Sequence, residues 1–358
     1  MNFLLYDIPA VGTALLFFTL GAGVGHLIVG WIDQLTDIPD DSASRSSLRG
    51  PQATWWRHVP LVGTLWPRRS EGRTREPLDC WCLLIELTTA LLFAGFVIAV
   101  TRFECQQTPE VAPSETWRCV RIFYHLILIS LLVAATGTDL REYTIPDSIT
   151  LTGAAVGLCG ATLSGQLQMV HIWVDWNQEI PGFRGPYFPD WLNPHQHLHG
   201  LAWSAAGLVA GAGLCWLVRV VSRLLLGRVA LGFGDVMLMG MIGSFVGWQA
   251  VTLIFLLAPL CAIVLGLIVR LTTGGTFLPY GPFLSVATVI VLFTWKWLWL
   301  ATRNTFGDVP SLARLGGIAF GALVALLGLI RLYRMIPVAR ASTTQESENR
   351  PPLDEDDA

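Results

Sequence analysis

The chain has 358 residues, of which 53% are hydrophobic and only 14% are charged, and its formal net charge is −3. Together with a mean hydropathy of +0.55, this composition excludes a soluble domain and is typical of a polytopic membrane protein. The seven cysteines include no CxxC pair, and Cys80 and Cys82 stand in a C-x-C spacing that suits no common zinc site. We therefore predict neither a metal centre nor a cofactor.

Nine apolar stretches are predicted to cross the bilayer, which a helix of about 20 residues can span. The first lies near the amino terminus, and Met1 to Ile8 lacks the basic region of a cleavable signal. Two stretches are short, and only Trp248 and Gln249 separate the sixth from the seventh. The stretches are 9–30, 83–100, 121–137, 149–163, 200–221, 236–248, 249–270, 282–300 and 315–333. The sequence thus predicts an all-α membrane helical bundle.

The distribution of basic residues predicts the orientation of this bundle. If the amino terminus lies outside, the alternate loops that face the cytoplasm hold 16 of the 23 basic residues. Cytoplasmic loops are enriched in arginine and lysine, so we expect the amino terminus outside and the carboxyl terminus inside.

Three segments lie outside the predicted spans. Residues 31–82 form a predicted cytoplasmic loop whose arginines and acidic residues are equal in number. Residues 164–199 form a predicted outer loop rich in tryptophan, proline and histidine. The polar tail 336–358 ends in four acidic residues before Ala358, and we predict that it is disordered.

Two aspartates stand where predicted spans meet water. Asp139 lies in Gly-Thr-Asp-Leu-Arg-Glu-Tyr-Thr-Ile-Pro-Asp (137–147), and Asp235 lies in Gly-Phe-Gly-Asp (232–235). A carboxylate near hydrocarbon is costly, which favours a functional role with a specific partner. The predicted topology puts both on the cytoplasmic face, so we expect each to be the other's partner. Two carboxylates that share a proton can carry out aspartyl proteolysis.

Helix polarity distinguishes the two carboxylates. Asp139 closes the third predicted span, where the partial negative charge of a helix carboxyl end favours a protonated carboxyl group. Asp235 opens the sixth span, where the helix amino end favours a carboxylate anion. We therefore predict that Asp139 holds the shared proton and that Asp235 is the base that activates water. The alternative is that both are ordinary interfacial or capping residues.

The residues around the aspartates suggest how each is presented. Gly232 and Gly234 permit a positive φ and let a substrate backbone approach the Asp235 carboxylate closely. Pro146 holds Ile145 extended and ends any continuing helix, which predicts a turn between spans at Asp139.

The ordered motifs resemble those of the type IV prepilin peptidases, the GxGD-type aspartyl membrane proteases of bacteria. The resemblance covers most of residues 20–300 and identifies Asp139 and Asp235 with the catalytic aspartates of the family. The motifs are T-D-L-R-E-Y-T-I-P-D (138–147), L-G-F-G-D-V-M-L-M-G-M-I-G-S-F-V-G-W-Q (231–249), P-Y-G-P-F-L (279–284), H-V-P-L-V (58–62) and C-L-L-I-E-L-T-T-A-L-L-F (82–93).

The resemblance implies an activity and a location. Such enzymes cut the basic leader from prepilins and pseudopilins, ahead of an apolar helix, at the cytoplasmic face of the bacterial inner membrane. Their products serve type IV pili and type II secretion. The implied partners are these substrates and the lipid bilayer, and we expect no nucleic acid.

Further residues are expected to support the site. Glu86 matches a glutamate of the family pattern within the second span, where we expect a supporting hydrogen bond. Asp147 is expected to cap the fourth helix. Gly281 and Pro282 open the eighth span on the same face as the aspartates and are expected to shape the substrate entrance.

The chain also departs from the family pattern. Many members carry two CxxC pairs in the cytoplasmic loop and methylate the new amino terminus, whereas residues 43–79 contain no cysteine. Val29 and Gln34 stand where an asparagine and an arginine are expected. These departures argue against a zinc-stabilised loop and put methylation in doubt.

We expect four regions along the chain. Residues 1–120 form a degenerate amino-terminal region, 121–300 the peptidase core, 301–335 an extra span and 336–358 the tail. A catalytically inactive assembly factor of the same fold and a polytopic transporter are the alternatives to a peptidase.

Two smaller groups allow alternative interpretations. His195, His197 and His199 have a spacing that could bind a metal, although solvated loop histidines are commoner. Cys105 and Cys119 flank one predicted outer loop and are either a disulfide or two free thiols.

Overall fold

The computed structural model of the chain describes residues 9–36, 77–111, 113–173, 194–273 and 279–335. Within these ranges the secondary structure is helical, apart from one isolated bridge between Thr108 and Val111. The helices are α1 (Ala10–Leu35), α4 (Pro77–Arg102), α5 (Glu115–Glu142), α6 (Asp147–Ser164), α7 (Gln196–Leu226), α8 (Phe233–Thr273), α9 (Gly281–Gly307) and α10 (Val309–Met335). The prediction of an all-α fold is confirmed. The cysteine-free loop and the acidic tail lie outside the described residues.

Seven of the described helices are long and apolar enough to cross a membrane, against nine predicted spans. The first difference is α6, an 18-residue helix whose Asp147 and hydroxyl side chains lower its hydropathy. The second is α8, which counts as one candidate span although a kink at Gly247 divides its 41 residues into two helices, close to the predicted division between 236–248 and 249–270.

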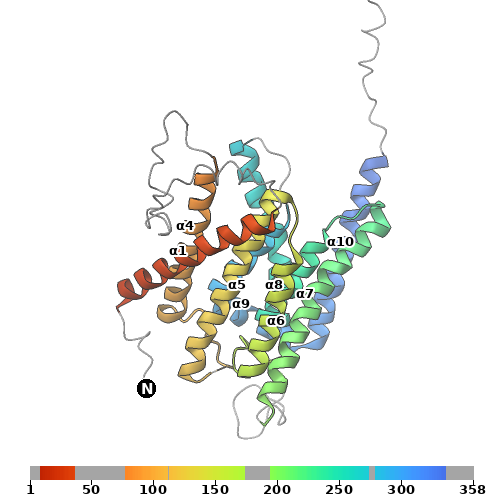
Figure 1. Cartoon of the computed structure of the whole chain (residues 1–358). Helices are drawn as coiled ribbons and strands as arrows, with labels where there is room; N and C mark the ends of the chain where they lie inside the picture. Colours follow the sequence, from red (N-terminus) through yellow and green to blue (C-terminus); the bar gives the residue numbers. More distant parts are fainter. Residues whose placement is uncertain (1–8, 37–76, 112, 174–193, 274–278, 336–358) are drawn as a thin grey trace, which may run out of the picture.

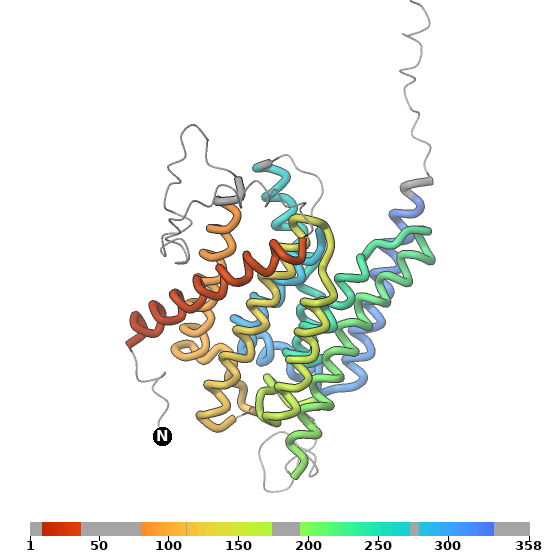
Figure 2. The backbone as a smooth tube through the Cα atoms, viewed as in Figure 1, coloured from red at the N-terminus to blue at the C-terminus, as the bar shows by residue number. Residues whose placement is uncertain are grey.

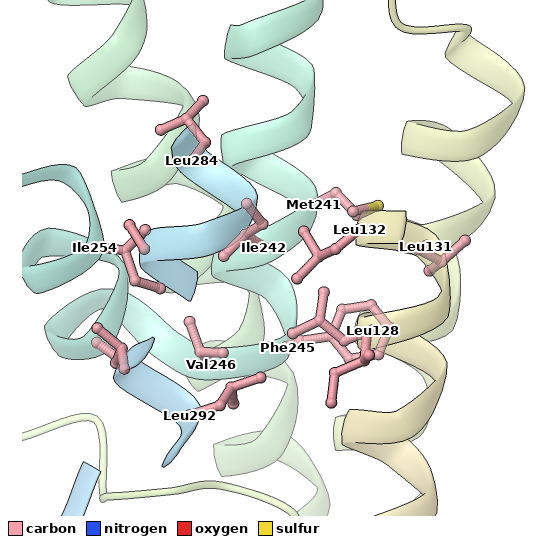
Figure 3. Packing of buried hydrophobic residues seen from close by; sticks show 14 of the residues in the cluster. Leu128, Leu131, Leu132, Met241, Ile242, Phe245, Val246, Ile254, Leu284 and Leu292 are labelled. Atoms are coloured by element: carbon pink, nitrogen blue, oxygen red, sulfur yellow. The ribbon is translucent and has the colours of Figure 1, made fainter. Parts of the chain in front are cut away.

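The chain nevertheless reverses within α8. Gly247 has a φ of 81° and a ψ of 170°, which no helix contains. A Cβ added at Gly211 would meet both the Met239 carbonyl and Val251 Cγ2, although Met239 and Val251 would lie about 18 Å apart along a straight helix. In Figure 3, Ile254 accordingly lies at about the same height as Ile242 and not further along one straight helix. The predicted boundary at Trp248 is therefore one residue from the observed break.

Glycines let α6, α7 and α8 pack with their backbones in close approach. A Cβ on Gly207 of α7 would collide with the Gly243 carbonyl of α8, and a Cβ on Gly243 would collide with that of Gly207. Gly200 faces the Ala161 carbonyl of α6 in the same way. Small residues at such contacts are typical of helices that associate within a bilayer. This packing brings the start of α8 beside the end of α7 (Figure 2).

The amino-terminal helices α1 and α4 pack on each other, and α1 crosses α4 and α5 obliquely in Figure 1. Gly25 of α1 lies against Glu86 of α4, and Ile32 and Ile85 reach Gly137 near the end of α5. At the other edge of the bundle, α10 contacts α7 and α9 (Figures 1 and 2).

The apolar core lies between α5, α8 and α9. Figure 3 shows Leu128 and Leu132 of α5 facing Met241 and Phe245 of α8, with Leu284 and Leu292 contributed by α9. These side chains are almost completely buried. The core fixes the three helices whose ends carry the aspartates and the 279–284 motif.

Candidate active site

Asp139 lies in the last turn of α5. The helix ends at Glu142, Tyr143 adopts a left-handed conformation with a φ of 56°, and its N–H donates to the Asp139 carbonyl at 3.0 Å. Pro146 then precedes α6 in an extended conformation. The predicted turn is confirmed, but it begins after Asp139, which remains helical.

Asp235 lies in the first turn of α8 and is held by its own sequence motif. The N–H of Gly232 donates to Asp235 Oδ2 at 3.0 Å. Neither Gly232 nor Gly234 has a positive φ, so that part of the prediction was wrong. Both glycines provide space instead, because a Cβ on Gly232 would lie 3.2 Å from Asp235 Oδ2 and a Cβ on Gly234 would lie 3.2 Å from Ile145 Cβ.

The two aspartates belong to one site. Both are buried, with Asp139 4% and Asp235 8% exposed, and their charges interact electrostatically. Asp139 Oδ2 accepts a hydrogen bond of 3.1 Å from the N–H of Gly281, the first residue of α9. Ile145 fills the space between the glycine turns, since it lies against both Gly234 and Gly281. Each carboxylate thus accepts one backbone N–H, so these hydrogen bonds do not distinguish the two.

Tyr280 brings a hydroxyl group to the same region. It precedes Gly281, and its carbonyl accepts the N–H of Phe283 at 3.0 Å. Burial raises the pKa of the Tyr280 hydroxyl, and the neighbouring Cys215 and Asp235 raise it further. The phenol therefore remains a hydrogen-bond donor at neutral pH.

The other predicted supporting residues, Pro282, Asp147 and Glu86, differ in burial and in their contacts. Pro282 is buried in the first turn of α9. Asp147 is exposed, and the prediction that it caps α6 was wrong, because Pro146 holds the cap position and no side chain bonds there. Glu86 is completely buried and lies 2.8 Å from Nδ1 of His26, a contact that joins α4 to α1.

The candidate metal ligands do not form a site. Among the described residues, no three histidine, cysteine or acidic side chains come together as metal ligands. His197 Nδ1 lies 2.9 Å from the Thr162 carbonyl, and His199 Nε2 accepts the N–H of Ile172 at 3.2 Å. Cys105 and Cys119 are buried free thiols and do not form a disulfide.

Two residues of the site were not predicted from the sequence. The sequence marks Ile145 only as the residue before Pro146, yet it packs between the two glycine turns. It marks Arg219 only as a basic residue at the membrane face, yet the guanidinium group donates to the Leu231 carbonyl at 2.6 Å. A lone arginine near a helix end gives no sequence signal for such a contact.

Comparison with known proteins relates the chain to the same family that the sequence motifs resemble. The profile of the type IV leader peptidase family matches residues 191–267, which contain Asp235 and its glycines. No solved structure matches the chain.

Curated relatives of the chain carry the name prepilin leader peptidase/N-methyltransferase, and three of them are compared below. The protein of Xanthomonas campestris pv. campestris is 26% identical over 253 residues, which cover 70% of this chain and 71% of the relative. That of Aeromonas hydrophila is 26% identical over 66% of each chain. That of Klebsiella pneumoniae is 29% identical over 57% of this chain and 68% of the relative. The chain thus spans about two thirds of the length of these relatives.

Proposed function

We propose that this chain, a hydrolase of the type IV leader peptidase family, is a membrane aspartyl endopeptidase that removes the leader from prepilin-like proteins. The observation that carries the proposal is the pair of buried carboxylates. Asp139 and Asp235 come from different helices, interact electrostatically, and are each held by the N–H of a glycine.

The proposed reaction uses one carboxylate as a base and the other as an acid. The base takes a proton from water, whose oxygen then attacks the scissile carbonyl carbon. The acid donates its proton to the carbonyl oxygen as negative charge develops there. The base then passes the proton taken from water to the amine nitrogen as the C–N bond breaks, and the acid recovers its proton as the new carboxyl group forms. From helix polarity we assign Asp235 as the base and Asp139 as the acid, and their titration belongs to the pair.

The position of the site favours a particular class of substrate. The aspartates lie at the ends of membrane helices, and Gly232 and Gly281 place no Cβ atom against the carboxylates. A substrate with an apolar helix could enter the membrane there and present its preceding peptide bond to the pair. The names of the relatives support a prepilin or pseudopilin of a pilus or secretion system as this substrate.

We propose that the protein lies in the inner membrane of a bacterium with this site facing the cytoplasm, as the distribution of arginines favours. Methylation is not part of the proposal. The names of the relatives include N-methyltransferase, but residues 43–79 of this chain contain no cysteine.

The proposal is tested by co-expressing the full chain with a candidate prepilin and measuring leader removal by electrophoresis. We expect wild type to cleave and Asp139→Asn and Asp235→Asn each to lose at least about 100-fold in rate, because each substitution removes an acid–base group. Asp147→Asn is the matched control, since this carboxylate is exposed and near the same helix ends.

The outcomes separate the alternatives. Full cleavage by both variants would exclude the aspartate pair as the catalytic machinery. Absence of cleavage by wild type, across prepilins and pseudopilins encoded in the same genome, would favour an inactive assembly factor.

A further inference from the structure

The turn that carries Asp235 is anchored to α7 by one arginine. Nη1 of Arg219 donates to the Leu231 carbonyl at 2.6 Å, and its guanidinium carbon lies 6.0 Å from the centre of the Phe233 ring. Leu231 and Phe233 are the two neighbours of Gly232, whose N–H binds the Asp235 carboxylate. One side chain therefore contacts the chain on both sides of the residue that holds Asp235.

The segment before the turn is fixed to the same helix. Gly227 ends α7 with a φ of 65°, and its N–H donates to the Arg223 carbonyl at 3.0 Å. The Ser222 hydroxyl then accepts the N–H of Ala230 at 3.1 Å. The Leu231 carbonyl that Arg219 binds is the last of these contacted groups along the chain and the nearest in sequence to Asp235.

An arginine suits this position for a specific physical reason. A guanidinium group can donate a hydrogen bond along its edge while its face lies over an aromatic ring, whereas a lysine ammonium group cannot do both in this way. The turn itself contains two glycines, which restrict the backbone least of all residues. The internal hydrogen bond from Gly232 to Asp235 is therefore expected to need support from contacts outside the turn.

We propose that Arg219 is a positioning residue that holds the Gly-Phe-Gly-Asp turn and thereby keeps Asp235 in its reactive position. The inference rests on the proposed function of the aspartate pair. Arg219 touches main chain and a ring and no reacting atom, so its loss is expected to slow the chemical step and to leave substrate binding unchanged.

The first test measures kcat and KM for leader removal by the purified full-length protein in proteoliposomes. We expect Arg219→Gln to lower kcat about 10- to 100-fold, as small misplacements of catalytic groups do, with KM changed less than twofold. Arg219→Lys, which keeps a donor but not the planar stacking, should lie between wild type and Arg219→Gln. The control is Arg223→Gln, an exposed arginine one turn further along α7, which should match wild type.

The second test does not depend on activity. Hydrogen–deuterium exchange of the 230–235 amides should rise at least several-fold in Arg219→Gln and remain at the wild-type level in Arg223→Gln. If Arg219→Gln does not fold, Phe233→Leu removes the stacking alone and should produce a smaller change in the same two readouts.

Unchanged exchange and unchanged kcat in Arg219→Gln would overturn the inference, as would a rise in KM at constant kcat. Wild-type protein that fails to cleave any substrate would instead count against the proposed function, and the exchange measurement would still decide the role of Arg219.

Discussion

At the scale of single residues, each of the two aspartates accepts a hydrogen bond from a glycine N–H, but one glycine is local and the other belongs to a distant helix. Asp235 binds the N–H of Gly232 three residues earlier, a contact contained within one turn. Asp139 binds the N–H of Gly281, which is 142 residues away and opens another helix. The position of Asp139 therefore depends on how α9 is placed against α5.

We predict that Gly281→Ala strongly impairs cleavage. The new Cβ would collide with Asp139 Oδ2 and would also press on Ile145. Displacing a catalytic group by about 1 Å can cost about 100-fold in rate, and we expect a loss of that order. The measurement is leader removal at equal amounts of folded protein.

The control for this substitution is Gly316→Ala in α10, where the added Cβ meets no atom within 4 Å. It should cleave at the wild-type rate. Equal rates for both alanine variants would show that the Gly281 contact does not position Asp139.

The sequence predicted the two aspartates and the glycines beside them, because short motifs keep their meaning without tertiary structure. It did not predict the partner of Asp139, since a hydrogen bond between residues 139 and 281 depends on helix packing. The positive φ expected at Gly232 was wrong for a related reason: a glycine can be required by space as well as by backbone conformation.

At the scale of elements, the reversal within α8 decides where the site lies. Its first segment runs from Asp235 into the bundle, and the chain turns at Gly247. Hydrophobicity predicted two stretches here because each segment is apolar. It could not predict that helical structure would resume directly after Gly247 without a connecting loop. The short predicted stretch 149–163 does correspond to a helix, α6, but α6 is not among the helices apolar enough to cross a membrane.

We predict that Gly247→Ala destabilises the protein. The position has a φ of 81°, and a Cβ there would collide with the indole of the buried Trp203. A non-glycine residue in such a conformation costs about 1–3 kcal/mol before the collision is counted. Thermal unfolding in detergent should show a lowered midpoint.

Gly266→Ala is the comparison, because it lies in the second segment of α8 with no atom within 4 Å of the new Cβ. Its midpoint should be unchanged or slightly raised, because alanine in place of glycine stabilises a helix interior by about 0.5–1 kcal/mol. A midpoint for Gly247→Ala as high as this control would contradict the structural role given to Gly247.

A polar contact also joins the amino-terminal helices to the end of α5. Arg141, two residues after Asp139, donates to Asp33 at 2.6 Å and lies 5.6 Å from the centre of the Trp81 ring. Asp33 belongs to α1 and Trp81 to α4. The contact therefore ties α1 and α4 to the helix end that carries Asp139.

We predict that exchanging the charges of Asp33 and Arg141 partly restores the cleavage rate that either single charge reversal lowers. Asp33→Arg and Arg141→Asp should each slow cleavage, and the double variant should recover about twofold relative to the sum of the single effects. That factor corresponds to a coupling of about 0.5 kcal/mol, the size usual for an ion pair with a solvent-exposed partner. If the effects of the two single substitutions on the cleavage rate simply add in the double variant, the ion pair contributes nothing to the site.

At the scale of the whole molecule, the two ends of the bundle are built differently. At the end with the aspartates, the N–H groups of Gly232 and Gly281 hold the two carboxylates. At the opposite end of α5, Arg121 donates to the carbonyls of Gln106 and Gln168 at 3.3 Å each, and Glu110 accepts the Trp299 indole N–H at 2.9 Å. These contacts join two connecting segments into one polar layer at the end of the bundle opposite the aspartates.

The last prediction concerns orientation, on which the cellular location of the site depends. Asp139 and Asp235 lie at the same end of the bundle as the carboxyl end of α1, because Asp33 bonds to Arg141 near Asp139 and Asp139 interacts with Asp235. If this end faces the cytoplasm, alkaline phosphatase fused after Glu142 should be inactive, and the same enzyme fused after Gln168 should be active. Green fluorescent protein fused after Met335 should fluoresce. The reverse pattern would place the aspartates outside, where a leader peptide that has not crossed the membrane could not reach them.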